Sequence, residues 1–379
     1  MGANSIGKEF VVTCFGESHG RCIGVVIDGC PAGLPIAESD IQNEIDKRLP
    51  ANQEIVSSRR EKDIVELLSG IYEGFTTGAP ICALVWNKSV ISSDYDLIKD
   101  KPRPGHADYP ARIKYMGFAD YRGGGRFSGR LTVAFIIAGA VAKKLLDFFG
   151  VEILAYTSEI GNVKLKKDLS INNIRTNTYK SSVRCPDLDL SKEMVDNILK
   201  AKKEGDSFGG IIECIALNLP VGVGEPIFDS LDADIAKMLF DIPAIKGVEF
   251  GLGFKASKLR GSENNDLYSV KNGEIETITN NCGGILGGLS SGMPLVVRLA
   301  VKPTPSISKK QKTVDISTNE ETSITISGRH DPCIVPKAVP VVEAAVASIL
   351  VDHLIRGGFI PKVLGVEVIE EYCDDKTKD

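Results

Sequence analysis

The stretch Arg122–Arg130 reads RGGGRFSGR, and an apolar run from Leu131 to Ala142 follows it directly. Glycine lets backbone amides approach a ligand closely and tolerates positive φ, while arginine and serine add hydrogen-bond donors. The apolar run predicts a helix whose positive N-terminal end would point towards whatever the loop holds. An isolated arginine–glycine tract is more typical of a flexible RNA-contacting tail, but this one lies between two segments with ordered patterns. We therefore interpret residues 122–130 as an anion-binding loop, with phosphate as the favoured anion.

The composition is that of a globular chain with local positive charge. Its 379 residues are 43% apolar and 25% charged, enough for one large domain or two smaller ones, and the net charge is −5. Such a chain lacks the broad basic surface that nucleic-acid binding needs, so we predict no nucleic-acid partner. Basic residues instead cluster at Lys47-Arg48, Arg59-Arg60, Lys101–Arg103 and the 122–130 loop, which favours a small anionic ligand. The pair Lys143-Lys144 is interpreted as solvated surface.

Nine cysteines are present without any Cys-x-x-Cys pair. The odd count, the apolar neighbours and the lack of a signal-peptide pattern predict free thiols in a reducing cytosol, and no zinc or other metal site. Lys143-Lys144 interrupts the longest apolar run, so we predict no membrane-spanning helix. These features together predict a cytoplasmic protein that acts without a metal and away from membranes.

Hydrophobic patterns predict alternating strands and helices along most of the chain. The expected strands cover residues 10–15, 23–28, 81–86, 151–156, 211–219 and 294–301. The expected helices cover residues 39–48 (capped by Ser39), 131–149, 191–203, 231–240 and 336–355. Residues 102–110 are predicted to form a stiff proline-rich loop, residues 164–180 no particular element, and residues 309–325 an exposed hairpin or mobile loop.

Four short motifs recur in the same order, which indicates an internal repeat. The matched pairs are residues 16–20 with 205–209, 40–41 with 234–235, 70–80 with 284–294, and 125–126 with 328–329. We infer a single α/β domain over residues 1–379, made of two pseudo-repeated halves at about residues 1–160 and 190–360. His19 of the first half corresponds to Phe208 of the second. Only the first half therefore has an ionisable group at this position of the motif. A chemical role for His19 explains this difference more readily than a packing role.

Three of the four histidines lie in loops rich in glycine, proline or arginine. These are His19, His106 and His330, whereas His353 falls in the last apolar helix and is interpreted as structural. Binding groups concentrate in such loops, and a histidine pKa near neutrality suits proton transfer. His19 and His106 are therefore candidate functional residues.

Two other functions are compatible with parts of this pattern. Gly16-Glu17-Ser18-His19-Gly20 fits the nucleophile elbow G-x-S-x-G of serine hydrolases, with Ser18 as nucleophile. That elbow needs a helix after the serine, where a strand is predicted, and the motif recurs at residues 205–209. The second alternative is a non-catalytic anion-binding module, which would bind a ligand without turnover.

Six loop segments taken together resemble the signature blocks of the chorismate synthase family. They are GESHG (16–20), RPGHADYP (103–110), RGGGRFSGR (122–130), NCGGILGGLSSG (281–292), KPTPS (302–306) and GRHDPC (328–333). The resemblance spans nearly the whole chain, in the family's order and spacing. It implies 1,4-anti elimination of phosphate from 5-enolpyruvylshikimate 3-phosphate to give chorismate, in the shikimate pathway towards aromatic amino acids. It also implies reduced FMN without net redox change, and a homotetramer of β-α-β sandwiches with central apolar helices between antiparallel sheets.

The resemblance also implies roles for individual residues. His19 would sit beside the departing phosphate, His106 would face the pyrimidine end of the flavin, and Asp331 with Ser18 would hold or accept a proton at flavin N5. The implied substrate-binding residues are Arg48, Arg103, Arg130 and Arg329. The implied flavin contacts are Arg126, Phe127, Ser128, Pro243, Ala244, Gly287, Lys302, Pro303, Thr304, Pro305, Ser306 and Arg329. His330 is interpreted as a structural neighbour.

The sequence departs from the family pattern at a few positions. Glu54 stands where many members have an anion-binding arginine, a role that Arg59 or Arg60 would have to fill. Phe127 replaces a small or polar residue, and Pro243 replaces a frequent asparagine and so removes a backbone N–H. No dinucleotide fingerprint is recognisable, so both an NADPH-dependent reductase activity and an external source of reduced flavin stay open.

Overall fold

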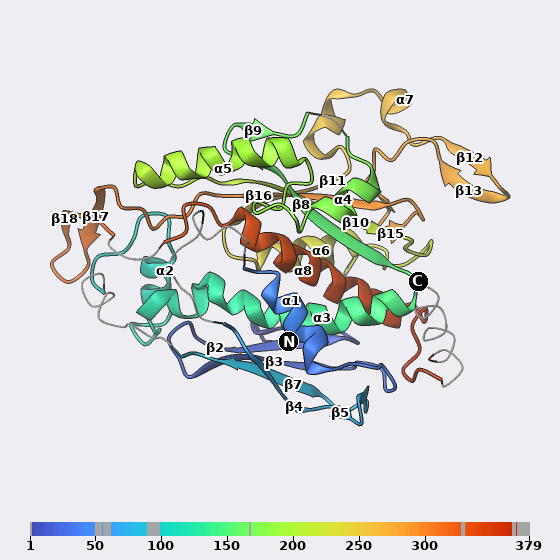
Figure 1. The fold of residues 1–379 in the computed structure, drawn as a ribbon, viewed down its shortest axis with the longest axis horizontal. Coiled ribbons are helices and arrows are strands. Elements are labelled where there is room, and N and C mark those ends of the chain that lie inside the picture. Colours follow the sequence, from blue (N-terminus) through green and yellow to red (C-terminus); the bar gives the residue numbers. More distant parts are fainter. Residues whose placement is uncertain are drawn as a thin grey trace.

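The computed structural model describes residues 2–49, 55, 62–88, 99–166, 168–326, 330–365 and 369. Two five-stranded antiparallel sheets lie on either side of a layer of helices (Figure 1). The predicted sandwich of central helices between antiparallel sheets is confirmed. Arg329, Glu54, Arg59 and Arg60, for which roles are predicted above, lie outside the described residues.

The first sheet has the strand order β1-β2-β3-β7-β4. Its strands are β1 (Ser5–Ile6), β2 (Val11–Gly16), β3 (Cys22–Asp28), β4 (Val65–Ser69) and β7 (Ile81–Trp86). Side chains alternate along a strand, so Ile81, Ala83 and Val85 of β7 are buried against the helices. Trp86 is on the other face and is 40% exposed. A small hairpin of β5 (Ile71–Tyr72) and β6 (Phe75–Thr76) lies between β4 and β7 in the chain.

The second sheet has the order β11-β16-β10-β8-β9. Its strands are β8 (Glu152–Ile160), β9 (Val163–Lys164), β10 (Gly210–Leu217), β11 (Ile245–Phe250) and β16 (Leu295–Val301). Neighbouring strands in the first sheet, read from β2, are β2, β3, β7 and β4. In the second sheet, read from β8, they are β8, β10, β16 and β11. In both sheets the last two of these strands are exchanged relative to their order in the chain. This shared order is what two copies of one plan require. The boundaries of the halves stay a prediction.

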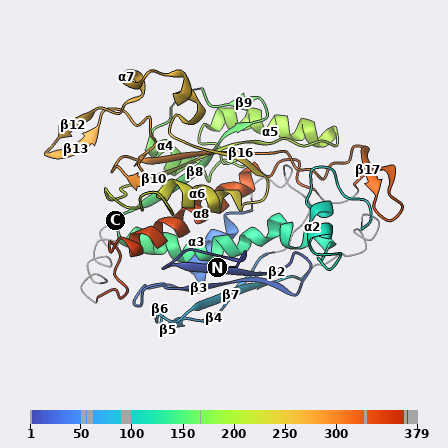
Figure 2. The same ribbon diagram turned by 180° about the vertical axis from the view of Figure 1, so that it is seen from behind.

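Four helices fill the space between the sheets, as Figure 2 shows from behind. They are α1 (Glu38–Asp46), α3 (Thr132–Phe148), α6 (Leu231–Phe240) and α8 (Val335–Arg356). Helices α1 and α3 pack on the first sheet, and α6 and α8 on the second. α3 and α8 both start at the end of the molecule that carries α2 (Asp108–Lys114) and the hairpin of β17 (Gln311–Asp315) and β18 (Glu320–Ile324) (Figure 1).

The two apolar helices α3 and α8 touch at their backbones. A Cβ atom added to Gly139 of α3 would lie 2.2 Å from the Cβ of Ala344 of α8, so only glycine fits there. Such close contact between small residues maximises packing at a helix crossing. α8 is 22 residues long and apolar enough to cross a membrane by length and composition, but this window is entirely buried in the protein. The expectation that no apolar helix reaches that length was therefore wrong.

Lys143 is not a solvated surface residue, contrary to the sequence interpretation. Its Nζ lies 2.9 Å from Glu343 Oε2 of α8 and 2.9 Å from Glu44 Oε2 of α1. Burial lowers the pKa of Lys143, but these two carboxylates outweigh burial and leave the pKa above its usual value. Glu343 also accepts hydrogen bonds from Tyr179 and from the backbone of Ala155. A buried ion pair whose remaining lone pairs are satisfied links three helices and a strand.

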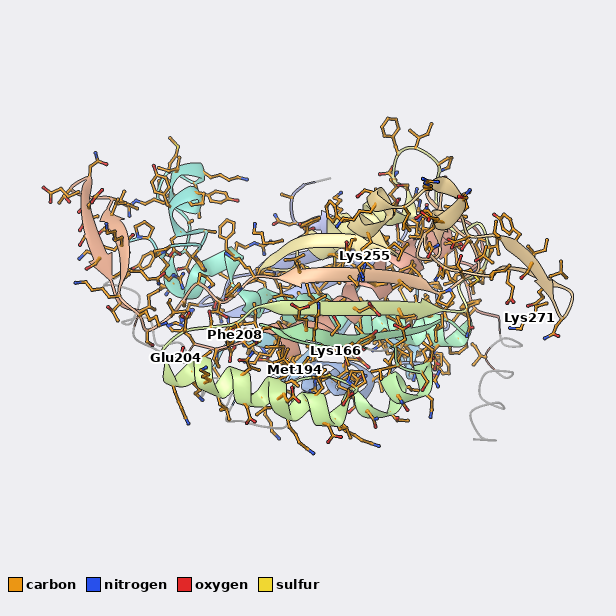
Figure 3. The ribbon with its side chains drawn as sticks, turned by 90° about the horizontal axis from the view of Figure 1, so that it is seen from above. Lys166, Met194, Glu204, Phe208, Lys255 and Lys271 are labelled. Atoms are coloured by element: carbon orange, nitrogen blue, oxygen red, sulfur yellow. The ribbon has the colours of Figure 1, made fainter. Side chains whose placement is uncertain are left out.

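The remaining elements lie at the periphery. α5 (Leu188–Lys203) runs along the β9 edge of the second sheet, with Met194 pointing into the core (Figure 3). The hairpin of β12 (Tyr268–Lys271) and β13 (Glu274–Thr277) projects from the molecule at Lys271 (Figure 3). The others are α4 (Ile171–Asn177), α7 (Gly261–Asn264), β14 (Ile285–Leu286) and β15 (Leu289–Ser290).

Three local predictions differ from the structure. α2 begins at Asp108, inside the stretch predicted to be a stiff loop, and α4 forms where no element was expected. Ser39 does not cap α1; Ala37 is the N-cap residue, and Asp40 Oδ2 accepts its backbone N–H at 2.9 Å. A carboxylate in the first turn therefore makes the half of a capping box that runs back to the N-cap N–H, and its charge also favours the helix N-terminus.

Candidate active site

The glycines of the 122–130 loop separate two histidines. Gly123, Gly124 and Gly125 have φ of 61°, 85° and 50°, which side-chain-bearing residues rarely adopt. A Cβ on Gly123 would lie 2.2 Å from the imidazole of His19, and one on Gly124 would lie 3.1 Å from that of His106. The loop therefore brings His19 and His106 to one short stretch of backbone.

His19 lies in the turn between β2 and β3. The backbone N–H of Ser18 donates to Gly125 O at 3.3 Å, which fixes this turn on the glycine loop. Ser18 is 2% exposed, and strand β3, not a helix, follows it. Both facts contradict a nucleophile elbow, so the serine-hydrolase interpretation is wrong. Asp120 is also close: a hydrogen bond from Arg122 lowers the pKa of Asp120, and the charge of His19 contributes to the shift.

Two predicted substrate arginines meet at a carboxylate that the sequence analysis did not identify. Arg130 Nη1 lies 2.9 Å from Asp63 Oδ1, and Arg48 Nη1 lies 3.4 Å from Asp63 Oδ2. Arg130 Nε donates to Asn87 Oδ1 at 2.6 Å, and Arg48 Nη2 donates to the carbonyl of Gly129 at 3.4 Å. The side chains of Arg48, Arg130 and Asp63 are all less than one-fifth exposed. This group is a preformed cationic cluster beside the glycine loop.

The third predicted arginine, Arg103, is tied to His106 through Asp108. Arg103 Nε and Nη2 donate to the two oxygens of Asp108, each at 2.8 Å, and His106 Nδ1 lies 2.7 Å from Asp108 Oδ1. Burial would raise the pKa of Asp108, but the hydrogen bonds from Arg103 and His106 hold it well below the usual value. Asp108 therefore stays ionised and orients both groups.

The KPTPS segment joins this cluster from the second half of the chain. Arg103 Nη1 donates to Ser306 Oγ at 3.3 Å, and Lys302 Nζ donates to the carbonyl of Gly105. The backbone N–H of Lys302 donates to Ala244 O at 2.9 Å, which also brings Pro243 and Ala244 to this place. Pro303 and Pro305 belong to the same segment. Among the described residues, no hydrogen-bond partner is found for the buried hydroxyl of Thr304.

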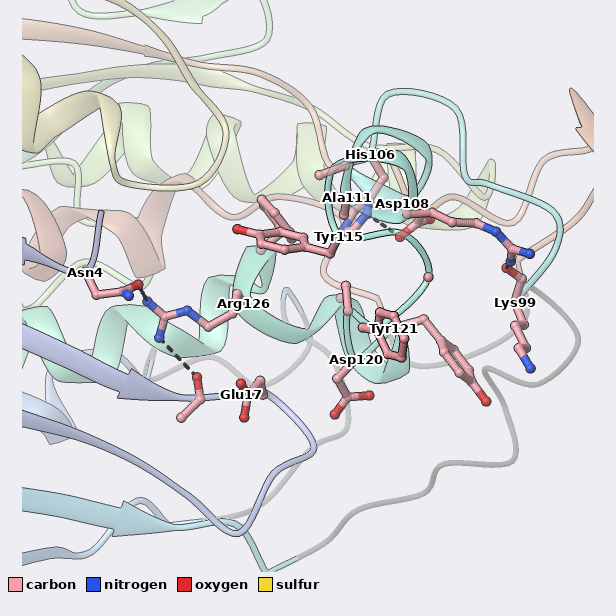
Figure 4. A pocket seen from close by; sticks show the side chains of 18 of the residues that line it. Asn4, Glu17, Lys99, His106, Asp108, Ala111, Tyr115, Asp120, Tyr121 and Arg126 are labelled. Atoms are coloured by element: carbon pink, nitrogen blue, oxygen red, sulfur yellow. Dashed lines mark hydrogen bonds and ion pairs between the residues drawn. The ribbon is translucent and has the colours of Figure 1, made fainter. Parts of the chain in front are cut away.

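Arg126 and Phe127 line a cavity of about 710 Å³ (Figure 4). The Arg126 guanidinium donates to Asn4 Oδ1 at 2.5 Å and to Gly16 O at 3.2 Å, so it anchors the loop on β2. His106 and Gly124 line the same cavity. Ser128 turns back into the loop, where its Oγ accepts the backbone N–H of Arg130. His19 and Asp331 are not among the residues that line this cavity.

Asp331 and Gly287 belong to two further segments of the chain. Both oxygens of Asp331 bind Lys337 Nζ, at 2.8 and 2.7 Å, just ahead of α8. Gly287 is in the β14–β15 turn, and β16 separates it along the chain from Lys302. A seven-residue strand is about 23 Å long, so Gly287 and Lys302 lie at opposite ends of it. Within the described ranges, no group of three or more histidines, cysteines or carboxylates could hold a metal ion.

The sequence analysis missed four polar residues of this site, namely Asp63, Asn87, Asp108 and Lys337. Asp108 could have been found, because a carboxylate two residues after His106 in the RPGHADYP block is a natural partner for it. Asp63 follows the basic Arg59-Arg60 pair by three residues, but nothing in the sequence marks Asp63 or Asn87 as a partner of Arg130. Their partners are 15 to 70 residues away along the chain, so only the tertiary fold reveals them.

Comparisons with known proteins identify the family of the chain. The family model for chorismate synthase matches residues 10–355. A chorismate synthase of Dehalococcoides mccartyi is 56% identical over 362 residues, covering 96% of this chain and 99% of the relative. One from Methanosarcina barkeri is 52% identical over 365 residues, covering 96% of this chain and all of the relative. A crystal structure of a chorismate synthase matches with a TM-score of 0.74 at 29% identity, over 98% of both chains. The chain belongs to the chorismate synthase family.

Proposed function

We propose that this chain converts 5-enolpyruvylshikimate 3-phosphate to chorismate by 1,4-anti elimination of phosphate. The observation that carries the proposal is the glycine loop with His19 and His106 against it and cationic clusters around Arg130 and Arg103. The substrate bears a phosphate and two carboxylates, and each charge-assisted hydrogen bond to such groups is worth about 1.5–3 kcal/mol. As a member of the shikimate pathway, the enzyme would act in the cytoplasm.

Within this proposal the cationic clusters around Arg130 and Arg103 have different roles. Arg48 and Arg130 bind anionic groups of the substrate beside His19, and His19 gives a proton to the departing phosphate or stabilises its charge. Arg103 binds the substrate next to His106, whose ring is held by Asp108. Arg329 is assigned to the same pocket by resemblance to the family only. Rigid placement of these groups before the substrate arrives supplies orientation and electrostatic stabilisation.

The residues around KPTPS fit reduced FMN. Lys302, Ser306 and the hydroxyl of Thr304, for which the described residues hold no partner, offer donors for a phosphate; His106 lies nearby, against the glycine loop that carries Ser128 and Phe127. When bound, reduced FMN supplies the electron-rich centre that makes the elimination possible without net redox change. Asp331, held by Lys337, is proposed to hold a proton near the flavin, and Ser18 to assist it.

Several exposed apolar surfaces support a homotetramer. Tyr268, Val270 and Ile275 of the β12–β13 hairpin are 70%, 74% and 73% exposed, and an isolated two-stranded hairpin is marginally stable in water. Trp86 lies on the uncovered face of the first sheet. Gly287 is distant from Lys302, so a flavin contact at Gly287 would come from a neighbouring subunit. Light scattering should give four times 40.8 kDa, about 163 kDa; a mass of about 41 kDa would refute the assembly.

The activity is tested by anaerobic incubation with dithionite-reduced FMN and 5-enolpyruvylshikimate 3-phosphate, following chorismate absorbance. We expect turnover with reduced FMN and none without flavin. Tight binding of the substrate without chorismate formation would instead favour a non-catalytic anion-binding module. Repeating the assay with oxidised FMN and NADPH alone tests the reductase question, since turnover there requires NADPH to reduce the flavin on this chain.

Substitution of the histidines tests their roles. We expect His19→Ala and His106→Ala each to lose at least about tenfold in turnover, about 1.4 kcal/mol or more of barrier, while staying folded. Wild-type turnover in both purified variants would refute the assignments.

A further inference from the structure

Asn87, the first residue after β7, connects two parts of the site. Its Nδ2 donates to Gly20 O at 2.8 Å and to Glu17 O at 3.1 Å, on either side of His19. Its Oδ1 accepts the bond from Arg130 Nε at 2.6 Å. Its backbone N–H also donates to Arg21 O at 3.0 Å. One amide therefore holds both ends of the His19 turn and the guanidinium of Arg130.

The chemistry of these bonds requires an amide at this position. Two carbonyls need donors and one guanidinium needs an acceptor, and an asparagine side chain supplies both on adjacent atoms. The network also fixes which way the amide points, because the reverse orientation would face NH₂ against Arg130 and oxygen against two carbonyls. Aspartate has the same size and would keep the acceptor for Arg130, but it has no donor for the carbonyls.

The bonds that hold Arg130 leave part of it for a ligand. Asn87 takes Nε and Asp63 takes Nη1, and neither bond uses Nη2. On the other side, His19 lies between the bonded carbonyls of Glu17 and Gly20 and against Gly123. A shift of Asn87 would therefore move the proposed proton donor and the proposed anion binder together.

We propose that Asn87 is a positioning residue that holds His19 and Arg130 at a fixed distance and orientation relative to each other for the elimination. The inference rests on the proposed roles of these two residues. Asn87 does not touch the reacting groups in this scheme; it acts by keeping the proton donor and the guanidinium at a fixed separation. Catalysis depends on such placement, since a displacement of about 1 Å can cost on the order of a hundredfold in rate.

The two halves of this role can be separated by substitution. Asn87→Asp keeps the acceptor for Arg130 and loses the donors to the His19 turn, so kcat should fall at least tenfold with KM for the substrate changed less than threefold. Asn87→Ala loses both contacts, so kcat should fall and KM should rise, each at least tenfold. Asn197→Ala is the matched control, because Asn197 on α5 also bonds a backbone carbonyl, but that of Ile160 at the end of β8 instead of those of the His19 turn; its kinetics should equal wild type.

A double-mutant cycle with His19→Ala tests whether Asn87 acts through His19. In the His19→Ala background, Asn87→Asp should lower kcat less than twofold further. Independent, multiplying losses would overturn the inference while leaving the proposed role of His19 intact. Wild-type turnover of His19→Ala would refute the proposed role of His19, and with it the inference that Asn87 positions His19. The inference that Asn87 positions Arg130 would then depend on KM of Asn87→Ala, and an unchanged KM would refute it. If Asn87→Asp does not fold, Asn87→Ser takes its place in the cycle with the same expectation.

Discussion

Replacing Gly123 by alanine tests the central contact of the site. The added Cβ would lie 2.2 Å from the His19 ring, and restoring an ordinary contact of 3.4 Å requires the ring to move by about 1.2 Å. The φ of 61° adds backbone strain of about 1–2 kcal/mol for a residue with a side chain. A shift of that size in a catalytic group costs on the order of a hundredfold in rate. We therefore expect a large loss of turnover with only a modest loss of stability.

Single-turnover chorismate formation with reduced FMN measures the first effect, and thermal unfolding measures the second. Gly150→Ala is the strain control, since Gly150 has φ of 68° with open space around it. It should lose stability as Gly123→Ala does and keep wild-type turnover. Gly129→Ala, in the same loop without strain or contact, should change neither. Wild-type turnover in folded Gly123→Ala would refute the contact between the glycine loop and His19.

Three further predictions follow from other contacts. Asp63→Asn removes the negative charge between Arg48 and Arg130, so inorganic phosphate should inhibit several-fold more strongly; unchanged or weaker inhibition would argue against an anion site at these arginines. Lys337→Ala removes the cation bound by both oxygens of Asp331, so turnover should fall several-fold while FMN affinity, measured by fluorescence, stays within threefold; wild-type turnover would argue against a positioning role for Lys337. Burial raises the pKa of buried thiols, that of Cys30 to about 12, so at pH 8 they should react with a thiol reagent only after unfolding, and fast reaction of the native protein at any of them would contradict this. These thiols are Cys30, Cys185, Cys214 and Cys333.

Regular patterns in the sequence predicted the strands and helices well. β7 and α6 have the predicted bounds, β3 differs by one residue at its start, and β2 and α8 differ by one residue at each end, because continuous apolar or periodic stretches are local information. The hairpin of β17 and β18 is one of the two forms expected for residues 309–325. α4 was missed, since its seven residues are mostly polar and its helix depends on Ile174 packing under the second sheet.

The site was predicted in its parts and not in its connections. Loops rich in glycine, histidine and arginine marked His19, His106 and the arginines, and the fold brings Arg48 and Arg130 to one carboxylate and Arg103 to His106. The residues that orient them could not be predicted, because partners such as Asp63 and Arg130 are far apart along the chain. Lys143 shows the same limit. A lysine pair in a helix predicts an exposed surface, and only the tertiary fold shows that Glu343, 200 residues later in the chain, pairs with Lys143.

The contact between Gly139 and Ala344 has a consequence for how the enzyme could change over evolution. The helix that follows the glycine loop and the helix that follows Asp331 meet at this crossing, and no side chain separates their backbones. A methyl group gained there would wedge the helices apart and shift both loops at their ends, far from the altered residue. The separation of the two loops at the starts of α3 and α8 is thus set in the middle of the protein, and residues of the loops themselves can vary while this helix contact is kept.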